Sequence, residues 1–168
     1  MVETLTAEIS EDLQERIRRL LERACDPERP LATAESCTGG LIASLLTDID
    51  GCSRAFARGY VAYTDDAKAE MLGVPKDLLA THGAVSRQVA IAMADGARAK
   101  SGAHSALSVT GFAGPAGEGQ EEGLVHFACA TKGRKTMHRE AHFGPLGRGG
   151  VRLACLPVAV EMFEEGLR

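Results

Sequence analysis

The segment Thr33-Ala34-Glu35-Ser36-Cys37-Thr38-Gly39-Gly40 decides how the rest of the chain is organised. It follows a short apolar stretch from Leu31 to Glu35, which is typical of a buried strand, and it precedes an apolar helix face that ends near Asp50-Gly51. Two glycines close the turn and let a ligand approach the backbone. We therefore expect a strand–turn–helix unit with Ser36 at the turn, where free helix N–H groups can stabilise an anion.

A helix cap is the simpler interpretation of the same turn. Thr38 is a candidate N-cap, and Ser, Thr and Gly gather at helix starts without any catalytic role. Cys37 is a rival nucleophile, because a thiolate is favoured at a helix N-terminus. No His lies near it in sequence to act as a base, so a small buried side chain is the simpler interpretation of Cys37. Taken alone, the turn leaves catalysis and capping both open.

The composition indicates one globular domain, residues 1–168, in which residues 1–7 look loose. The chain has 168 residues, 45% hydrophobic and 25% charged, and its net charge is −4. This charge argues against nucleic acid or an anionic membrane as the main partner, although a local cluster of Arg and Lys can still bind a small anion. No apolar run approaches the length of a membrane span, and the N-terminus lacks the apolar core of a signal peptide.

The cysteines indicate a reducing compartment. There are five, an odd number, and none forms a C-x-x-C pair, so we expect neither a disulfide framework nor a structural zinc site. Free thiols are typical of the cytoplasm, where we expect the protein to be.

Hydrophobic spacing predicts the element order α-βα-βαα-α-βββ-α. Mixed parallel and antiparallel strands with helices on both faces fit this order. Loops are expected at 111–123 and 144–150. The expected helices cover residues 9–24, a stretch after Gly40, 65–72, a short turn after Pro75, 87–101 and 151–165, and the expected strands cover 31–35, 57–63, 105–110, 124–130 and 137–143.

Tyr63 and Lys68 flank the start of the third expected helix and could activate a serine. A lysine in a dry pocket can lose its proton and act as a base, and a tyrosine hydroxyl can relay or orient that proton. The alternative is a solvated helix lysine paired with Asp65 or Asp66. Without further context, the solvated lysine is the simpler interpretation.

Two later segments could bind the remainder of a ligand. The turn Thr110-Gly111-Phe112-Ala113-Gly114-Pro115 follows a strand, and its backbone N–H groups could hold a carbonyl or phosphate. Arg148 and Arg152 share a helix face and could grip a phosphate, with Arg58 as a third candidate. A tight turn and exposed surface charges are the simpler interpretations.

We expect no metal site and no dinucleotide or P-loop motif. His138 and His142 would share one face of a strand, but the sequence offers no further ligands beside them. The glycine-rich stretches match neither the dinucleotide-binding pattern nor the P-loop pattern.

Taken together, these segments resemble the C-terminal domain of the competence/damage-inducible protein CinA, which is also found alone as nicotinamide-nucleotide (NMN) amidase. The resemblance extends from about residue 8 to the C-terminus. It is carried, in order, by Thr33–Gly40, Gly59–Lys68, Leu72-Gly73-Val74, His82–Ser86, Val109–Pro115, and Arg148 with Val151-Arg152.

The resemblance implies a single α/β domain, a three-layer α/β/α sandwich with a mixed sheet, often a homodimer. It implies hydrolysis of nicotinamide mononucleotide to nicotinate mononucleotide and ammonia, in pyridine nucleotide recycling, without metal or organic cofactor. Ser36 matches the nucleophile, and Tyr63 and Lys68 match its activating partners. The implied substrate-binding residues are Thr38, Gly39, Gly40, Thr110, Gly111, Ala113, Gly114, Arg148 and Arg152.

One loop departs from the family pattern. Where relatives usually have Lys-Pro-Val-Gly-Thr-Val, this chain has Gln120-Glu121-Glu122-Gly123-Leu124-Val125. An acidic loop there could alter phosphate affinity or substrate choice. A nucleotide-binding or partner-binding module that has lost efficient chemistry is therefore the alternative function, and a thiol hydrolase that uses Cys37 is a third.

Overall fold

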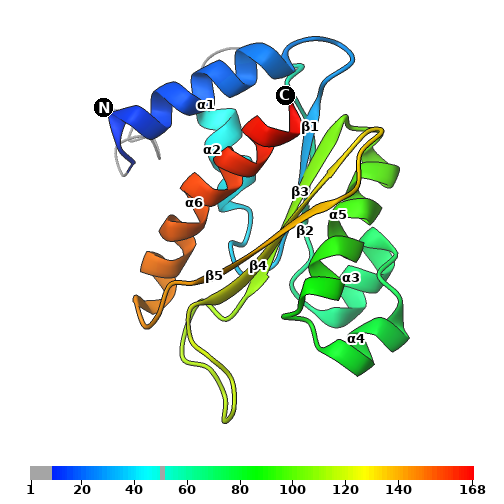
Figure 1. Ribbon diagram of the computed structural model, residues 1–168, viewed down its shortest axis with the longest axis vertical. Coiled ribbons are helices and arrows are strands. Elements are labelled where there is room, and N and C mark those ends of the chain that lie inside the picture. Colours follow the sequence, from blue (N-terminus) through cyan, green and yellow to red (C-terminus); the bar gives the residue numbers. More distant parts are fainter. Residues whose placement is uncertain (1–8, 50–51) are drawn as a thin grey trace.

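The computed structural model describes residues 9–49 and 52–168, and the expectations for residues 1–7 and for a helix end near Asp50-Gly51 lie partly or wholly outside these ranges. The element order confirms the order predicted from the sequence (Figure 1). The elements are α1 (Glu11–Ala24), β1 (Leu31–Glu35), α2 (Leu41–Asp48), β2 (Phe56–Val61), α3 (Asp65–Leu72), α4 (Lys76–His82), α5 (Arg87–Ser101), β3 (Ser105–Gly111), β4 (Leu124–Thr131), β5 (Met137–His142) and α6 (Gly147–Gly166).

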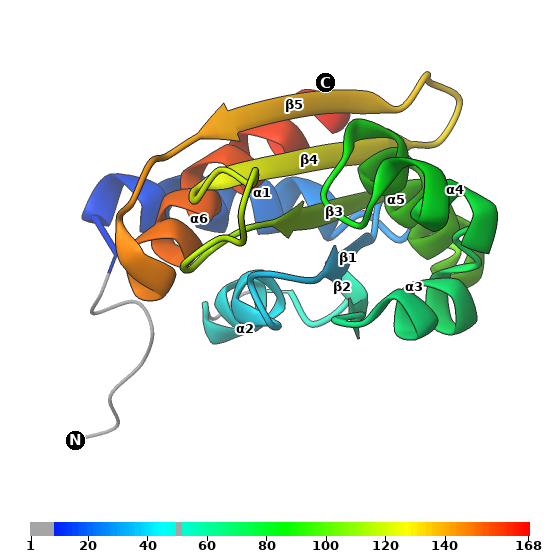
Figure 2. The same cartoon turned by 90° about the horizontal axis from the view of Figure 1, so that it is seen from below.

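A mixed five-stranded sheet forms the middle layer of the fold. Its strand order is β2-β1-β3-β4-β5, with β1 parallel to β2 and β3, and with β4 antiparallel to both of its neighbours. Helices α1, α2 and α6 cover one face, and α3, α4 and α5 cover the other (Figures 1 and 2). The three-layer α/β/α sandwich is therefore confirmed, and β1 lies inside the sheet, where both neighbours bury it.

Local sequence explains most of the element boundaries. Ser10, Thr64 and Ser86 cap α1, α3 and α5, each accepting a backbone N–H with its side chain. Gly73 and Gly102 end α3 and α5 in the left-handed conformation, at φ of 71° and 68°. No helix in the described part of the chain is long and apolar enough to cross a membrane.

Two expected boundaries were wrong, one by two residues and the other by four. The second strand was expected to reach Tyr63 but ends at Val61, because the chain turns there to reach the cap of α3 at Thr64. The last helix was expected to begin at Val151 but begins at Gly147. Three glycines in its first turn hid the helical pattern there, and Pro157 lies inside the same helix without ending it.

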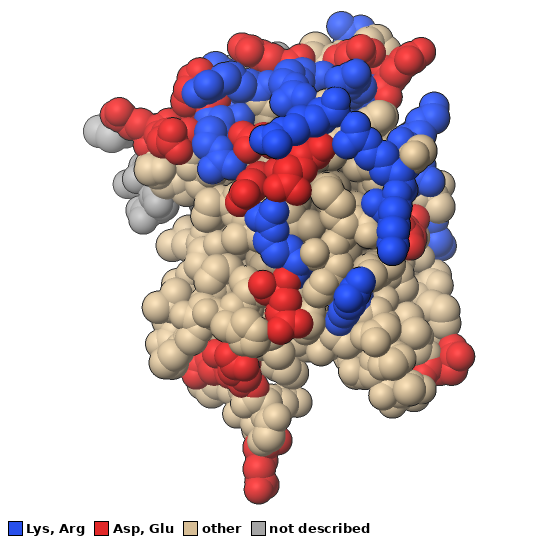
Figure 3. Space-filling view, in the orientation of Figure 1, with Lys and Arg blue, Asp and Glu red and all other residues tan. Residues whose placement is uncertain are grey.

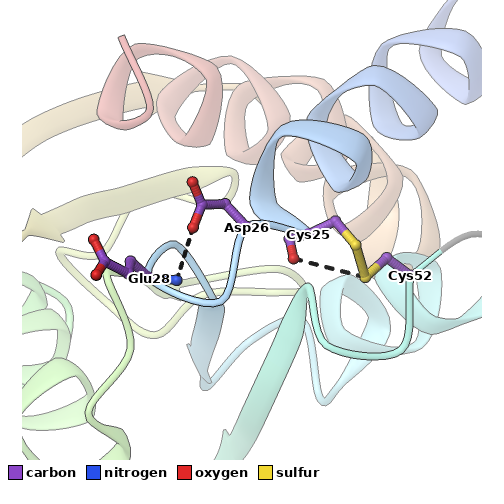
Figure 4. Close-up of a disulfide and its surroundings, with 4 residues drawn as sticks. All are labelled: Cys25, Asp26, Glu28 and Cys52. Atoms are coloured by element: carbon purple, nitrogen blue, oxygen red, sulfur yellow. Dashed lines mark hydrogen bonds between the residues drawn. A yellow bond between two sulfur atoms is a disulfide. The ribbon is translucent and has the colours of Figure 1, made fainter.

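The expectation of free thiols was wrong for two of the five cysteines. Cys25, which caps the end of α1, forms a disulfide with Cys52 in the segment before β2, with a Cα–Cα distance of 5.5 Å (Figure 4). The two residues are 27 apart in sequence and become neighbours only when α1 packs beside that segment. The thiol argument for a reducing compartment therefore depends on Cys37, Cys129 and Cys155, which are free and buried.

Candidate active site

Ser36 lies at the carboxyl end of β1, between the strand and α2. Because β2 and β3 flank β1 on opposite sides, this end is the point at which the parallel strand order diverges, where ligands bind in open α/β sheets. The Ser36 N–H donates to the Val109 carbonyl of β3 at 2.9 Å, and the Gly39 N–H returns to the Ser36 carbonyl at 3.1 Å. Both bonds hold the turn in one conformation, with the Ser36 side chain 7% exposed.

Two first-turn amides of α2 donate to the Glu35 side chain, and none donates to the Thr38 side chain within the described residues. Glu35 is fully buried, and its carboxylate accepts the Ile42 N–H at 3.0 Å and the Ala43 N–H at 2.8 Å. The expected N-cap at Thr38 was therefore wrong: Gly40 occupies the cap position, with a φ of 91° that glycine adopts without strain. An anion at Ser36 cannot use these two amides, because the carboxylate already holds them.

Lys68 reaches Ser36 from α3 on the other side of the turn. Its Nζ donates to Ser36 Oγ at 3.1 Å and to the backbone carbonyl of Tyr63 at 3.0 Å. Its side chain is only 1% exposed, so the expectation of a solvated surface lysine does not apply. Burial lowers the pKa of the Lys68 ammonium, against the opposing charges of Asp65 and Cys37.

A pocket of about 220 Å³ opens over the Ser36–Lys68 pair. It lies where β1, the start of α3, the segment before α5, the end of β3 and the start of α6 converge. Its lining consists of Ser36, Cys37, Tyr63, Lys68, Ala84, Val85, Thr110, Gly111, Phe112, Ala113 and Arg148. The Thr110 hydroxyl donates to the Ala84 carbonyl at 2.8 Å, which joins two of these walls.

The two arginines of α6 differ in what they contact. Arg148 lines the pocket, and its guanidinium lies so close over Gly114 that an added Cβ would meet it at 2.9 Å. Arg152 donates to the Thr38 carbonyl from Nε at 3.2 Å and from Nη2 at 2.9 Å. Arg58 is outside the pocket lining and donates to the Lys100 carbonyl. Only Arg148 of the three therefore faces ligand space.

The structure thus divides the residues expected at the site. Seven of them line the pocket, namely Ser36, Tyr63, Lys68, Thr110, Gly111, Ala113 and Arg148. Five others are not part of the lining: Arg152 contacts the Thr38 carbonyl, Gly39 and Gly40 belong to the turn, and Gly114 lies against Arg148. Tyr63 contributes its carbonyl to Lys68, and its side chain is 61% exposed at the pocket wall.

Sequence reasoning missed Ala84, Val85 and Phe112 as wall residues and Glu35 as the group that caps α2. Ala84 and Val85 carry no reactive group that could mark them. Glu35 did carry a signal, because a carboxylate in a fully buried strand needs hydrogen-bond donors, and the nearest unpaired donors are those of the following helix.

Cys37 lies in the pocket wall, with Cys155 of α6 behind it. The hydrogen bond between the two thiols, together with burial, raises the pKa of Cys155. Both thiols are buried, and neither hydrogen-bonds to a histidine in the described part of the chain. The packing interpretation of Cys37 accounts for these contacts.

The acidic loop and the histidines of β5 lie outside the pocket. Glu121 accepts from His142 Nδ1 at 2.8 Å, and Glu140 accepts from His142 Nε2 at the same distance. Both contacts raise the pKa of His142. His138 Nε2 instead contacts His126 Nδ1 of β4 at 3.0 Å, so His138 and His142 do not face a common metal ion. No group of three metal-ligating side chains occurs in the residues that the structure describes.

Known proteins share this architecture and sequence. The chain is similar to the competence/damage inducible protein CihA from Agrobacterium tumefaciens, with a TM-score of 0.91, 42% identity and full coverage of both chains. It is 48% identical over 117 residues to the nicotinamide-nucleotide amidohydrolase PncC of Escherichia coli K12, covering 68% of this chain and 71% of that protein.

Longer relatives also match. The chain is 47% identical over 137 residues to a CinA-like protein of Geobacter sp. strain M21, a match that covers 80% of this chain but 32% of that protein. The chain therefore spans about a third of the length of such curated relatives. The model of the CinA C-terminal domain family matches residues 10–167. The chain belongs to the CinA C-terminal domain family.

Proposed function

We propose that the chain is an amidohydrolase that converts nicotinamide mononucleotide to nicotinate mononucleotide and ammonia. The observation that carries this proposal is the hydrogen bond of 3.1 Å between Lys68 Nζ and Ser36 Oγ, with both side chains buried at the base of a pocket. Burial disfavours the ammonium form of Lys68, so the amine can serve as the base for the serine. The similarity to PncC supports the choice of substrate.

In the proposed reaction, Ser36 Oγ attacks the carboxamide carbon while the neutral Lys68 amine takes the serine proton. The C–O bond to Ser36 forms, and the carbonyl electrons move onto oxygen. The amides of Cys37 and Thr38 make no hydrogen bond within the described residues, and we assign them to this oxyanion. The oxyanion then collapses, the C–N bond breaks, and Lys68 returns the proton so that ammonia leaves.

Water completes the cycle by hydrolysing the acyl-serine, with Lys68 again as the base. The Tyr63 carbonyl keeps the amine beside Ser36 through both half-reactions. Arg148, at the pocket wall, balances the substrate phosphate. The pocket volume of about 220 Å³ suits the nicotinamide ring and the sugar, so we place the phosphate at the rim, where Arg148 is exposed.

The test is ammonia release from nicotinamide mononucleotide by the wild type and by Ser36→Ala. We expect turnover by the wild type and loss of at least about a thousandfold in the variant, because no other hydroxyl in residues 9–49 and 52–168 hydrogen-bonds to Lys68. Ser44→Ala, on the exposed part of α2, is the matched control and should keep full rate.

Full activity of the Ser36→Ala variant would show that Ser36 is not the nucleophile. Tight mononucleotide binding without turnover by the wild type would favour the binding-module alternative. Inactivation by Cys37→Ser with Ser36→Ala still active would favour the thiol mechanism. The expected homodimer is checked separately by light scattering.

A further inference from the structure

A second pocket lies between α1 and the end of α6 and shares no residue with the pocket at Ser36. Its volume is about 280 Å³, larger than the 220 Å³ at Ser36. It is lined by Arg16, Arg19, Leu20, Arg23, Glu164 and Arg168. Figure 3 shows Lys and Arg side chains gathered over this part of the molecule, with acidic residues beside them.

The lining is strongly cationic in an acidic protein. Its side chains carry four guanidinium groups and one carboxylate, whereas the whole chain has a net charge of −4. Arg16, Arg19 and Arg23 are three and four residues apart, so they project from one face of α1 toward α6. Guanidinium groups held on one helix face repel each other, and an anion bound among them would relieve this repulsion.

The contacts leave donors free in this pocket. Glu164 neutralises Arg16 through two bonds of 3.1 and 2.7 Å. Arg23 donates from Nη2 to the Leu167 carbonyl at 2.8 Å, and it forms no ion pair with the residues that the structure describes. Within the described residues, the Arg168 guanidinium forms no ion pair, and Arg19 is paired only with Glu15, across an exposed helix face at 3.2 Å.

The side chains that line the pocket indicate which class of ligand it can bind. Arginine forks match the geometry of phosphate oxygens, and several on one face suit an anion with more than one phosphate. The lining contains no aromatic side chain on which a base could stack, and Leu20 is its only apolar residue. We propose that this pocket binds a small oligophosphate, recognised through its phosphate chain and not through a base.

Calorimetric titration with inorganic pyrophosphate at low ionic strength tests the proposal. We expect saturable binding at one site per chain. Arg19→Gln should weaken this binding about tenfold, the loss expected for one charge-assisted contact. Arg18→Gln is the matched control, because Arg18 pairs with the same Glu15 and is similarly exposed but does not line the pocket. It should change the affinity by less than about twofold.

A variant that is expected to strengthen binding distinguishes an effect on the pocket from loss of the fold. Glu164→Gln removes the only acidic side chain of the lining and releases Arg16, so pyrophosphate should bind several-fold more tightly. A damaged protein could not produce that gain. Uridine diphosphate should bind about as well as pyrophosphate, since the base makes no contact.

Several results would overturn the proposal. These are no saturable pyrophosphate binding, equal losses for Arg19→Gln and Arg18→Gln, or weaker binding by Glu164→Gln. Loss of binding in Arg148→Gln would assign the anion to the pocket at Ser36. Displacement of pyrophosphate by a short DNA duplex, with equal sensitivity to Arg18 and Arg19, would indicate an extended surface for nucleic acid.

Discussion

Replacing Glu35 by Gln should destabilise the fold through the start of α2. The carboxylate accepts two buried amides, from Ile42 and Ala43. Glutamine retains the shape of the side chain but offers one acceptor oxygen, so its NH₂ group faces one of the two N–H donors. A hydrogen bond to a charged group contributes about 1.5–3 kcal/mol, and a buried donor left without a partner costs about 1–3 kcal/mol.

Part of this cost is offset, because the neutral amide is easier to bury than the carboxylate. We expect Glu35→Gln to lower the free energy of unfolding by about 2–4 kcal/mol, a large part of the stability of a small domain. Urea denaturation measures this as a lower midpoint with an unchanged slope.

Glu28→Gln is the matched control, since Glu28 is exposed and its side chain caps no helix. It should shift the free energy of unfolding by less than about 0.5 kcal/mol. If Glu35→Gln behaves like this control, the two amides do not depend on the carboxylate, and the account of how the Ser36 turn is held is wrong.

Further predictions concern the base, the arginines and the disulfide. Lys68→Met should slow ammonia release about 10²–10⁴-fold. In the proposed mechanism the neutral amine is the base, and burial lowers its pKa, so kcat/KM of the wild type should rise with pH through that pKa; a flat profile across about pH 6 to 9 would contradict this. Arg152→Ala frees the Thr38 carbonyl and should mainly lower kcat, whereas Arg148→Ala should mainly raise KM. A higher KM for Arg152→Ala and a lower kcat for Arg148→Ala would show that the two roles are reversed. Reducing the Cys25–Cys52 bond should lower the free energy of unfolding by about 3–4 kcal/mol, measured by urea denaturation with and without dithiothreitol; coincident curves would show that the bond carries no stability.

Local patterns predicted the elements well because their signals are local. The apolar run at Leu31 predicted a buried strand from near neighbours alone, and the structure confirms it. The start of the last helix at Gly147 was misassigned, because the glycines of its first turn hide the helical pattern.

Contacts between distant residues could not be predicted from these patterns. The sequence near Lys68 is that of an ordinary exposed helix, and only its placement beneath β1 makes the lysine buried. The Cys25–Cys52 bond and the hydrogen bonds from Arg152 to the Thr38 carbonyl likewise depend on segments that are distant in sequence and pack together on one face of the sheet. For Lys68, resemblance to a family supplied the partner that spacing alone could not.

The position of β1 between two parallel neighbours also determines when the site can exist. Ser36 and Lys68 are 32 residues apart, and the Arg152–Thr38 contact spans 114 residues. Parallel pairing and such long loops close slowly during folding. Before α3 and α6 dock, Lys68 is solvated as an ammonium ion and cannot act as the proposed base for Ser36. The proposed mechanism therefore predicts an incompletely folded chain that is inactive at Ser36, and the appearance of ammonia release during refolding would time the final docking step.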